Sequence, residues 1–502
     1  MIVRPRVSLL TDKEVRQIHE ASLEILEKTG CLYDTPAALD ILEAHGEKVD
    51  RDSMVATIRR ETVEKCIKTA PRKFVLASRD GLHDAAIDGV QMHHMTDGQG
   101  SFTLDEKTGE RRTSTLHDLL LSTLLADALD PIRVVWSTVF PTDASTDYRA
   151  LFETAGSFMW SGKHFQMVGG VQDPEDVPYI LEMLDAVYGD RRKQRDRPIY
   201  SMVTCPVSPL KHDSSMTEAC IALAKEWVPI VFWPMPLQGA TSPITMAGTL
   251  LQTNVEFLSG LVLYQLVQPG LPMIYPAGPE TLDMKTSLAS TASPEGMVLN
   301  LAFAQMTDFY QVPYMAGGIC SDAKIPGIQC AYENMGTGMS AALSGCDLLV
   351  GIGLLEDGNT LSFPQMVIDE EICNILSFIR NGMEVSRETL DVESIHRVGF
   401  SPNHHLAEPA TMAYIKSPKA FWPRISFRGT YGDWKRRGKD EVQLARDRMK
   451  ELLDKHEPPT LPAEVQKELR RLLCKRTGYS ENDWRIQTVF RHPWKEGPAP
   501  KN

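Results

Sequence analysis

The sequence predicts a TIM barrel, an α/β fold in which eight βα units close into a ring, with helical extensions at both ends. Short apolar runs alternate with longer segments that have helical character from about residue 91 onward. The starts of most runs are separated by about the length of one βαβ unit, which favours a parallel sheet. No run is followed by a glycine-rich phosphate loop, so an open doubly wound sheet is the weaker alternative.

Seven of the eight strands are predicted directly from apolar runs. They lie at Val134–Phe140, His164–Val171, Pro198–Cys205, Pro229–Pro236, Pro272–Gly278, Pro313–Cys320 and Asp347–Leu355. The eighth is placed near Gln91–Leu104, because the segment Thr115–Ala128 supplies the helix needed before Val134. The other predicted helices are Pro174–Val187, Ser214–Trp227, Ser242–Val267, Pro294–Tyr310, Ile328–Leu343 and a final one near Ile368–Ile379.

The chain divides into three predicted parts. Residues 1–90 form a helical N-terminal extension, whose first helix has a capping-box pair at Thr11 and Glu14 and ends at Gly30. Residues 91–380 form the barrel, and residues 381–502 form a mostly helical C-terminal extension. The basic run Trp434–Lys439 in this extension fits either a solvated face or a docking surface for an acidic partner.

Composition excludes several classes of protein. The 502 residues are 42% apolar and 24% charged, and the net charge of −13 argues against a nucleic-acid partner. The most apolar long stretch, Thr245–Val267, is interrupted by Gln252, Asn254 and Glu256, which favours a buried helix over a membrane span. With no signal-peptide pattern at the start, we expect a soluble cytoplasmic protein without membrane contact.

The nine cysteines indicate reduced thiols. Their number is odd, they are scattered, and no CxxC pair occurs among them. A zinc site built from Cys205, Cys320 and a histidine lacks any supporting ligand spacing, so no bound metal is expected.

Aromatic residues are concentrated at the predicted barrel mouth, where the carboxyl ends of the strands meet and where TIM barrels hold their active sites. They are Trp136, Phe232, Trp233, Tyr275 and Phe363. Aromatic faces attract a cation that cannot donate hydrogen bonds, such as a quaternary ammonium. Each ring alone also suits the core, and strand alternation prevents Phe232 and Trp233 from both pointing inward.

Charged residues near the same end are candidates for the rest of the site. Glu256, in the most apolar helix, needs a buried partner, a functional role or an exposed turn. Asp322 and Lys324, in the run SDAK after the sixth apolar run, could face the two charges of a zwitterion or belong to an ordinary Asp-capped turn. Glu356 ends the last strand.

Long stretches of the chain resemble the trimethylamine methyltransferase family. They are PLQGATSPITMAGTLLQTNVEFLSGLVLYQLVQPGLPMIYPAG at 236–278, LDMKTS at 282–287 and AGGICSDAKIPGIQCAYE at 316–333. The opening IHEASLEILEKTG at 18–30 is similar as well. The resemblance implies a TIM barrel that transfers a methyl group to the Co(I) of a corrinoid carried by a separate partner protein.

The founding members of this family act on trimethylamine and use pyrrolysine near the barrel mouth. This chain has ordinary side chains at Ser321–Lys324, where we place the corresponding region. Members without pyrrolysine act on quaternary amines, so the resemblance implies glycine betaine, which would give dimethylglycine. Proline betaine, carnitine and γ-butyrobetaine are the alternatives.

The resemblance and the strand ends together assign roles to the candidate residues. The five aromatics form a cage for the trimethylammonium head, with Glu256 or Glu356 as a negative wall. Glu256, Glu356 and Asp322 are the predicted catalytic residues. Lys324, or else Lys285, binds the substrate carboxylate. A betaine-binding subunit without catalysis and a barrel for another methyl donor, such as a methylamine or a methylthiol, remain as rivals. Contacts between the outer helices of identical chains are a further expectation.

Overall fold

Eight parallel strands close into a barrel in the computed structural model, which describes residues 2–278 and 280–501. The strands are β7 (His93–Thr96), β10 (Ile132–Val135), β11 (His164–Met167), β12 (Tyr200–Thr204), β14 (Ile230–Phe232), β16 (Met273–Ala277), β19 (Tyr314–Gly317) and β20 (Leu348–Ile352). Each strand pairs in parallel with the next, and β20 returns to pair with β7. The predicted TIM barrel is therefore confirmed.

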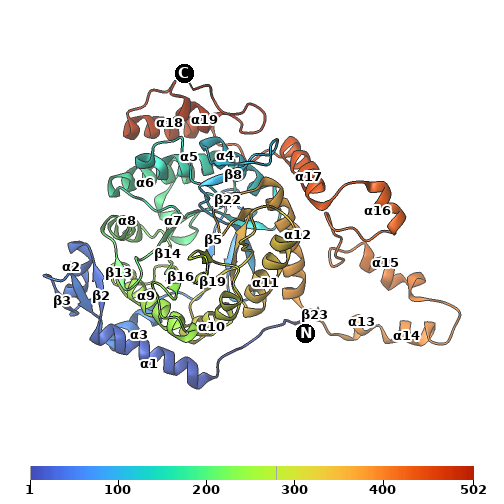
Figure 1. Cartoon of the computed structure of the whole chain (residues 1–502), viewed down its shortest axis with the longest axis horizontal. Helices are drawn as coiled ribbons and strands as arrows, with labels where there is room; N and C mark the ends of the chain where they lie inside the picture. The colour runs from blue at the N-terminus through green and yellow to red at the C-terminus, as the bar shows by residue number, and fades with distance from the viewer. Residues whose placement is uncertain (1, 279, 502) are drawn as a thin grey trace.

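Eight long helices surround the barrel (Figure 1). They are α4 (Leu116–Ala128), α5 (Arg149–Trp160), α6 (Val177–Tyr188), α8 (Ser214–Lys225), α9 (Met246–Val267), α10 (Pro294–Tyr310), α11 (Ile328–Ser344) and α12 (Phe363–Asn381). The sequence analysis named no helix at α5, which is buried along its whole length. None of the described helices is both long and apolar enough to cross a membrane.

The strand predicted at Gln91–Leu104 is two strands with a break between them. β7 belongs to the barrel, whereas β8 (Phe102–Leu104) joins a small sheet with β9 (Arg111–Thr113), β21 (Leu354–Leu355) and β22 (Thr360–Leu361). A second small sheet contains β15 (Leu237–Gln238), β17 (Glu280–Leu282) and β18 (Ala289–Ser290). Both follow carboxyl ends of barrel strands, so they build the rim of the mouth.

Alternation along the strands separates the barrel interior from the helix interface. Val231 and Trp233 pack inside the barrel with residues of the other strands, such as Val134 and Ile274. Phe232, between them, points outward onto α9, where a Cβ on Gly260 would lie 2.4 Å from its ring. Glycine at position 260 therefore allows α9 to approach the barrel closely.

The N-terminal extension packs on α9 through α1 (Asp12–Lys28), α2 (Pro36–Ala44) and α3 (Arg60–Thr69). The predicted capping box of Thr11 and Glu14 is present at the start of α1. A four-stranded sheet joins β2 (Cys31–Tyr33), β3 (Lys48–Asp50), β4 (Val55–Thr57) and β13 (Lys211–His212). The hairpin of β5 (Phe74–Leu76) and β6 (Ala85–Ile87) packs against the apolar barrel interior.

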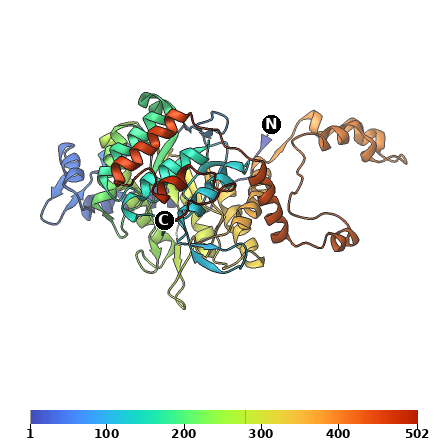
Figure 2. The ribbon, with the colours of Figure 1, turned by 90° about the horizontal axis from the view of Figure 1, so that it is seen from above.

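The C-terminal extension returns to the barrel after an outlying arm. The helices α17 (Glu441–Lys455), α18 (Ala463–Thr477) and α19 (Trp484–Phe490) pack on α4, α5, α6 and α12. The arm, residues 385–419, stands away from the barrel in both views (Figures 1 and 2) and contains α13 (Arg387–Leu390), α14 (Val392–Val398) and α15 (Pro409–Ile415). After the arm the chain returns to α12, where the main-chain N–H groups of residues 424–426 donate to the Glu371 carboxylate. Strand β1 (Ile2–Val3) pairs with β23 (Met383–Glu384). The remaining elements are α7 (Arg191–Asp196), α16 (Tyr431–Arg437) and the short 3-10 turns Thr146–Tyr148, Pro174–Asp176 and His405–Ala407.

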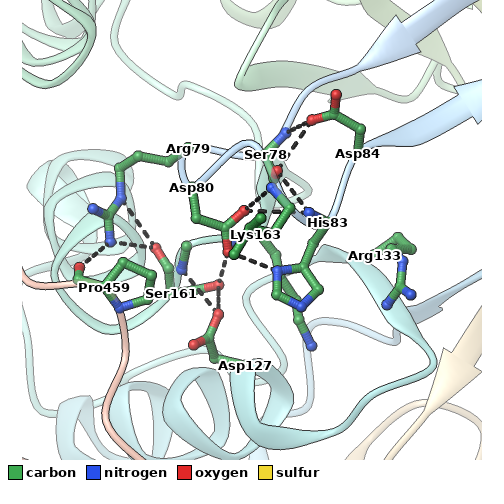
Figure 3. Close-up of polar contacts among 12 residues, drawn as sticks. Ser78, Arg79, Asp80, His83, Asp84, Asp127, Arg133, Ser161, Lys163 and Pro459 are labelled. Carbon is green, nitrogen blue, oxygen red and sulfur yellow. Dashed lines mark hydrogen bonds and ion pairs between the residues drawn. The ribbon is translucent and has the colours of Figure 1, made fainter.

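A buried polar cluster at the amino end of the barrel ties the C-terminal extension in place (Figure 3). The Lys163 ammonium donates to the carbonyls of Ala126 and Leu129, at 2.8 and 2.7 Å, where α4 ends. Asp127 accepts from Ser161 Oγ at 2.9 Å, and Arg79 donates to the Pro459 carbonyl at 2.6 Å. A cation at a helix C-terminus is stabilising, so these charges support the fold.

Candidate functional site

A small cavity of about 130 Å³ lies at the carboxyl end of the barrel. Residues from or just after the barrel strands form most of its lining, together with residues of the rim. The lining comprises Asp97, Gly98, Trp136, Val168, Val203, Cys205, Trp233, Met235, Gly278, Glu280, Thr291, Gly296, Asn300, Gly317, Cys320, Val350, Asp357 and Gly358. Pockets for drug-sized ligands span about 300–1,000 Å³, so this cavity suits a smaller molecule.

Two tryptophans form the aromatic wall of the cavity. The rings of Trp136 and Trp233 have centroids 5.2 Å apart and planes inclined at 58°. Trp136 is fixed by its indole N–H, which donates to Gln166 Oε1 at 2.7 Å. The Trp233 ring sits over Gly278, where a Cβ would approach it to 2.7 Å. Its indole nitrogen is buried and has no hydrogen-bond partner among the described residues.

Three carboxylates form the acidic part of the lining. Asp97 directly follows β7, Glu280 belongs to β17, and Asp357 lies in the turn after β21. Asp357 has a left-handed backbone with φ of +57°, and its Oδ1 accepts from the Thr291 N–H at 2.8 Å. Across the described part of the chain, no ion pair involves any of the three.

Burial and mutual repulsion make two of these carboxylates weak acids. Burial raises the pKa of Asp97 to about 7, and the negative charge of Asp357 contributes in the same direction. The pKa of Glu280 is also raised to about 7, by burial and by the charges of Asp357, Asp97 and Asp322. A cation inside the cavity would reverse both shifts, because it favours the ionised forms.

The composition of the lining favours a cation over an anion. Two aromatic faces and three carboxylates meet in it, and no lysine or arginine is among its described lining residues. Aromatic faces and carboxylates both attract positive charge, and the same wall repels an anion. A small methylated ammonium matches this charge, size and partly apolar lining.

Comparison with known proteins identifies the family. The family model for trimethylamine methyltransferase (MTTB) matches residues 2–479. The chain belongs to the trimethylamine methyltransferase family. It is 32% identical to the trimethylamine methyltransferase of Desulfitobacterium hafniense, covering 92% of each chain. It is 33% identical to that of Methanosarcina thermophila, covering 92% of this chain and 96% of the relative.

A relative named for another substrate is also similar. This member of the family is 29% identical to the glycine betaine methyltransferase of Desulfitobacterium hafniense, covering 94% of this chain and 98% of the relative. These three relatives are all named methyltransferases, and each match spans more than nine-tenths of this chain. The protein is therefore a methyltransferase.

Of the five aromatics predicted for the cage, the structure places Trp136 and Trp233 in the cavity lining. Phe232 lies outside the barrel, 5.0 Å from the His212 ring, and Tyr275 lies 4.0 Å from the Phe257 ring. Phe363 begins α12 and belongs to the core around the barrel. Side chains alternate along a strand, which explains why Phe232 and its neighbour Trp233 lie on opposite sides of the barrel wall.

The charged residues predicted for the site have other partners in this family member. Glu256 accepts from Ser208 Oγ at 2.7 Å and from the Leu210 N–H at 3.0 Å. Glu356 pairs with Arg111 at 3.1 Å. Lys324 is exposed and donates to the main-chain carbonyl of Asp322 at 2.7 Å.

Asp322 and Lys285 also lie outside the cavity lining. The Asp322 carboxylate accepts from the Ser290 hydroxyl, and Lys285 is exposed. None of the predicted carboxylates or lysines is therefore among the described residues that surround the cavity.

The three lining carboxylates were missed by the sequence analysis. Asp97 stands in the run TDG at 96–98, and Asp357 in EDGN at 356–359, both directly after short strands. For Asp357 the available signal was an Asp-Gly pair just after the predicted strand Asp347–Leu355, since such loops carry the site. For Asp97 the Asp-Gly pair lay inside the predicted strand Gln91–Leu104 and indicated the break that the structure shows. Glu280 lies in a rim strand whose position no periodicity indicates.

The two cysteines in the lining are protonated thiols. Burial raises the pKa of Cys205 to about 12, and burial also raises the pKa of Cys320 well above its usual range. Zinc requires thiolates, which this surrounding disfavours. Within the described ranges, no three histidine, cysteine or acidic side chains are arranged to hold a metal ion.

Proposed function

We propose that this protein transfers a methyl group from a quaternary methylammonium compound to the Co(I) of a corrinoid carried by a separate protein. The observation that carries the proposal is the composition of the cavity lining. Among the described residues it has two tryptophan faces, three carboxylates without an ion-pair partner, and no lysine or arginine. Family membership supplies the reaction type. Glycine betaine, for which one relative is named, is the first compound to test.

The chemistry requires little from acid–base groups in this chain. The cobalt supplies the electron pair for the new bond to carbon, and the amine leaves with the electron pair of the broken C–N bond. A quaternary nitrogen is already positively charged, so it needs no proton before it leaves. The protein's part is to hold the head against Trp136 and Trp233, to exclude water and to aim one methyl group at the mouth.

The size of the cavity supports placing the corrinoid on a partner. A space of about 130 Å³ takes a small amine but not a corrin macrocycle. The macrocycle would therefore rest on the rim, against the sheets that contain β8 and β17. The free state of all nine cysteines fits the proposed location in a reducing cytoplasm.

A methyl-transfer assay tests the proposal. Purified protein is mixed with a corrinoid protein reduced to Co(I) and with glycine betaine, proline betaine, carnitine, choline or trimethylamine in separate reactions. We expect the Co(I) absorbance to disappear with at least one quaternary amine and to persist when Asp357→Asn protein is used. Tight binding of an amine with persistent Co(I) in every reaction would favour a binding subunit without catalysis.

A further inference from the structure

We infer that the cavity selects a methylammonium cation that carries a neutral oxygen and no carboxylate, so that a trimethylammonium alcohol fits better than a betaine. This inference rests on the proposed function and names the substrate class within it. Three observations support it. The first is the negative charge of Asp97, Glu280 and Asp357, which we call the acidic wall; the others are the position of the lysines and two lining donors without an acceptor.

When its three carboxylates are ionised, the acidic wall has more negative charge than one ammonium head neutralises. Asp97, Glu280 and Asp357 all line the cavity, and no ion pair among the described residues offsets them. A betaine brings a carboxylate into the same small space as its cation. Since like charges repel strongly where water is excluded, the betaine loses much of the attraction that its head gains.

No lysine or arginine is positioned to receive a substrate carboxylate. Lys324 is exposed and bonded to the Asp322 carbonyl, and Lys285 is exposed on the rim. Arg111 is occupied by Glu356 at 3.1 Å and stacks on Phe102, 3.5 Å from the ring centroid. Arg149, which follows the carboxyl end of β10, donates to the Gly169 carbonyl and pairs with Glu153 at 3.3 Å, so it also lies outside the lining.

Two hydrogen-bond donors in the lining have no acceptor among the described residues. They are the indole N–H of Trp233, a residue that is 6% exposed, and the hydroxyl of Thr291. A buried donor without a partner is unfavourable, so a ligand oxygen in the cavity would satisfy one or both. A hydroxyl supplies this acceptor without negative charge, and its own proton can be donated to a wall carboxylate.

Protonation of the wall determines the conditions for a clear test. The pKa values of Asp97 and Glu280 are raised to about 7, chiefly by burial, so an empty cavity holds protons near neutrality. A protonated carboxyl could donate a hydrogen bond to a betaine carboxylate, which would reduce the difference in affinity between choline and glycine betaine. At pH 8.5 (chosen about 1.5 units above these values) both groups are mostly ionised.

Binding is measured by calorimetry on the full-length protein at that pH and constant ionic strength. The ligands are choline, propyltrimethylammonium and glycine betaine. Propyltrimethylammonium matches choline in shape, with a methyl group in place of the hydroxyl. We expect choline to bind about tenfold or more tightly than glycine betaine, and more tightly than propyltrimethylammonium. Glycine betaine binding as tightly as choline, or choline binding no better than propyltrimethylammonium, would overturn the inference.

Variants assign the discrimination to particular residues. Glu280→Gln removes one wall charge and should narrow the choline-to-betaine ratio several-fold, whereas Glu110→Gln, on the exposed β8–β9 turn, should leave the ratio unchanged. Trp233→Phe keeps a ring but removes the N–H, so it should reduce the preference for choline over propyltrimethylammonium. An unaltered ratio in Glu280→Gln contradicts the charge argument even if Trp233→Phe protein fails to fold.

Methyl transfer separates this inference from the proposed function. Loss of Co(I) with glycine betaine but not with choline would overturn the inference and leave the function standing. Persistent Co(I) with every compound, together with the expected binding order, would overturn the function and leave the selectivity of the cavity standing. Co(I) loss with choline supports both.

Discussion

Trp233 and Phe232 are adjacent aromatics with different environments, and their replacement tests the aromatic wall. Trp233 faces the cavity, whereas Phe232 packs between the barrel and α9. Cation–π contacts contribute about 0.5–2 kcal/mol each. Trp233→Leu should therefore weaken tetramethylammonium binding by about 1 kcal/mol, measured by calorimetry. Phe232→Leu serves as the control, since it should lower the thermal midpoint while leaving that affinity unchanged; equal losses of affinity would remove Trp233 from the cation site.

Cation affinity should depend on pH through the acidic wall. Tetramethylammonium has a permanent charge, so only the protein titrates. The pKa values of Asp97 and Glu280 are raised to about 7 in the empty cavity, and a bound cation lowers them. Below pH 7 the cation must displace protons and binds weakly. Affinity should rise between about pH 6 and pH 8 and then level off, as measured by calorimetry over that range.

Other titratable groups near the cavity do not reverse this sign. Asp322 is an acid with a raised pKa, so it ionises in the same direction. The thiols of Cys205 and Cys320 have pKa values raised by burial and stay neutral over this range. Glu280→Gln should flatten the profile. Affinity that falls as pH rises would contradict the proposed role of the carboxylates.

At the scale of elements, α9 illustrates a buried carboxylate with a structural role. Glu256 in this helix holds the loop at Ser208 and Leu210 through two hydrogen bonds of 2.7 and 3.0 Å. Glu256→Ala would leave both donors unpaired, at a cost of about 1–3 kcal/mol each where they are buried. We expect a thermal midpoint lower by several degrees in differential scanning fluorimetry, with choline affinity within about twofold of the parent. A loss of choline affinity with an unchanged thermal midpoint would instead indicate that Glu256 belongs to the binding site.

The elements were largely predictable from the sequence, but the site was predictable only in part. Apolar runs locate strands because a parallel strand is buried on both faces, and period and caps locate helices. Strand alternation allows only one of Phe232 and Trp233 to face the barrel interior, but the sequence does not show which one does. Asp357 and Glu280 reach the cavity through rim loops, whose conformations depend on contacts between distant segments such as Thr291 with Asp357.

At the scale of the whole molecule, the C-terminal extension has a well-packed part and an exposed part. Helices α17, α18 and α19 bury apolar residues, among them Leu453, Leu472 and Ile486, against the outer barrel helices. In the arm, helices α13 and α15 contain no buried residue, and large side chains such as Phe400 and Leu406 are exposed. Local stability follows burial, so the arm should open first.

Limited trypsin digestion should therefore cut the arm before any other segment. Arg387, Arg397 and Lys416 are its expected sites, identified by mass spectrometry of the first products. The two fragments should elute together in size-exclusion chromatography, because α17 remains packed on α12. Resistance of the arm to trypsin under conditions that cut other segments would contradict its predicted low stability.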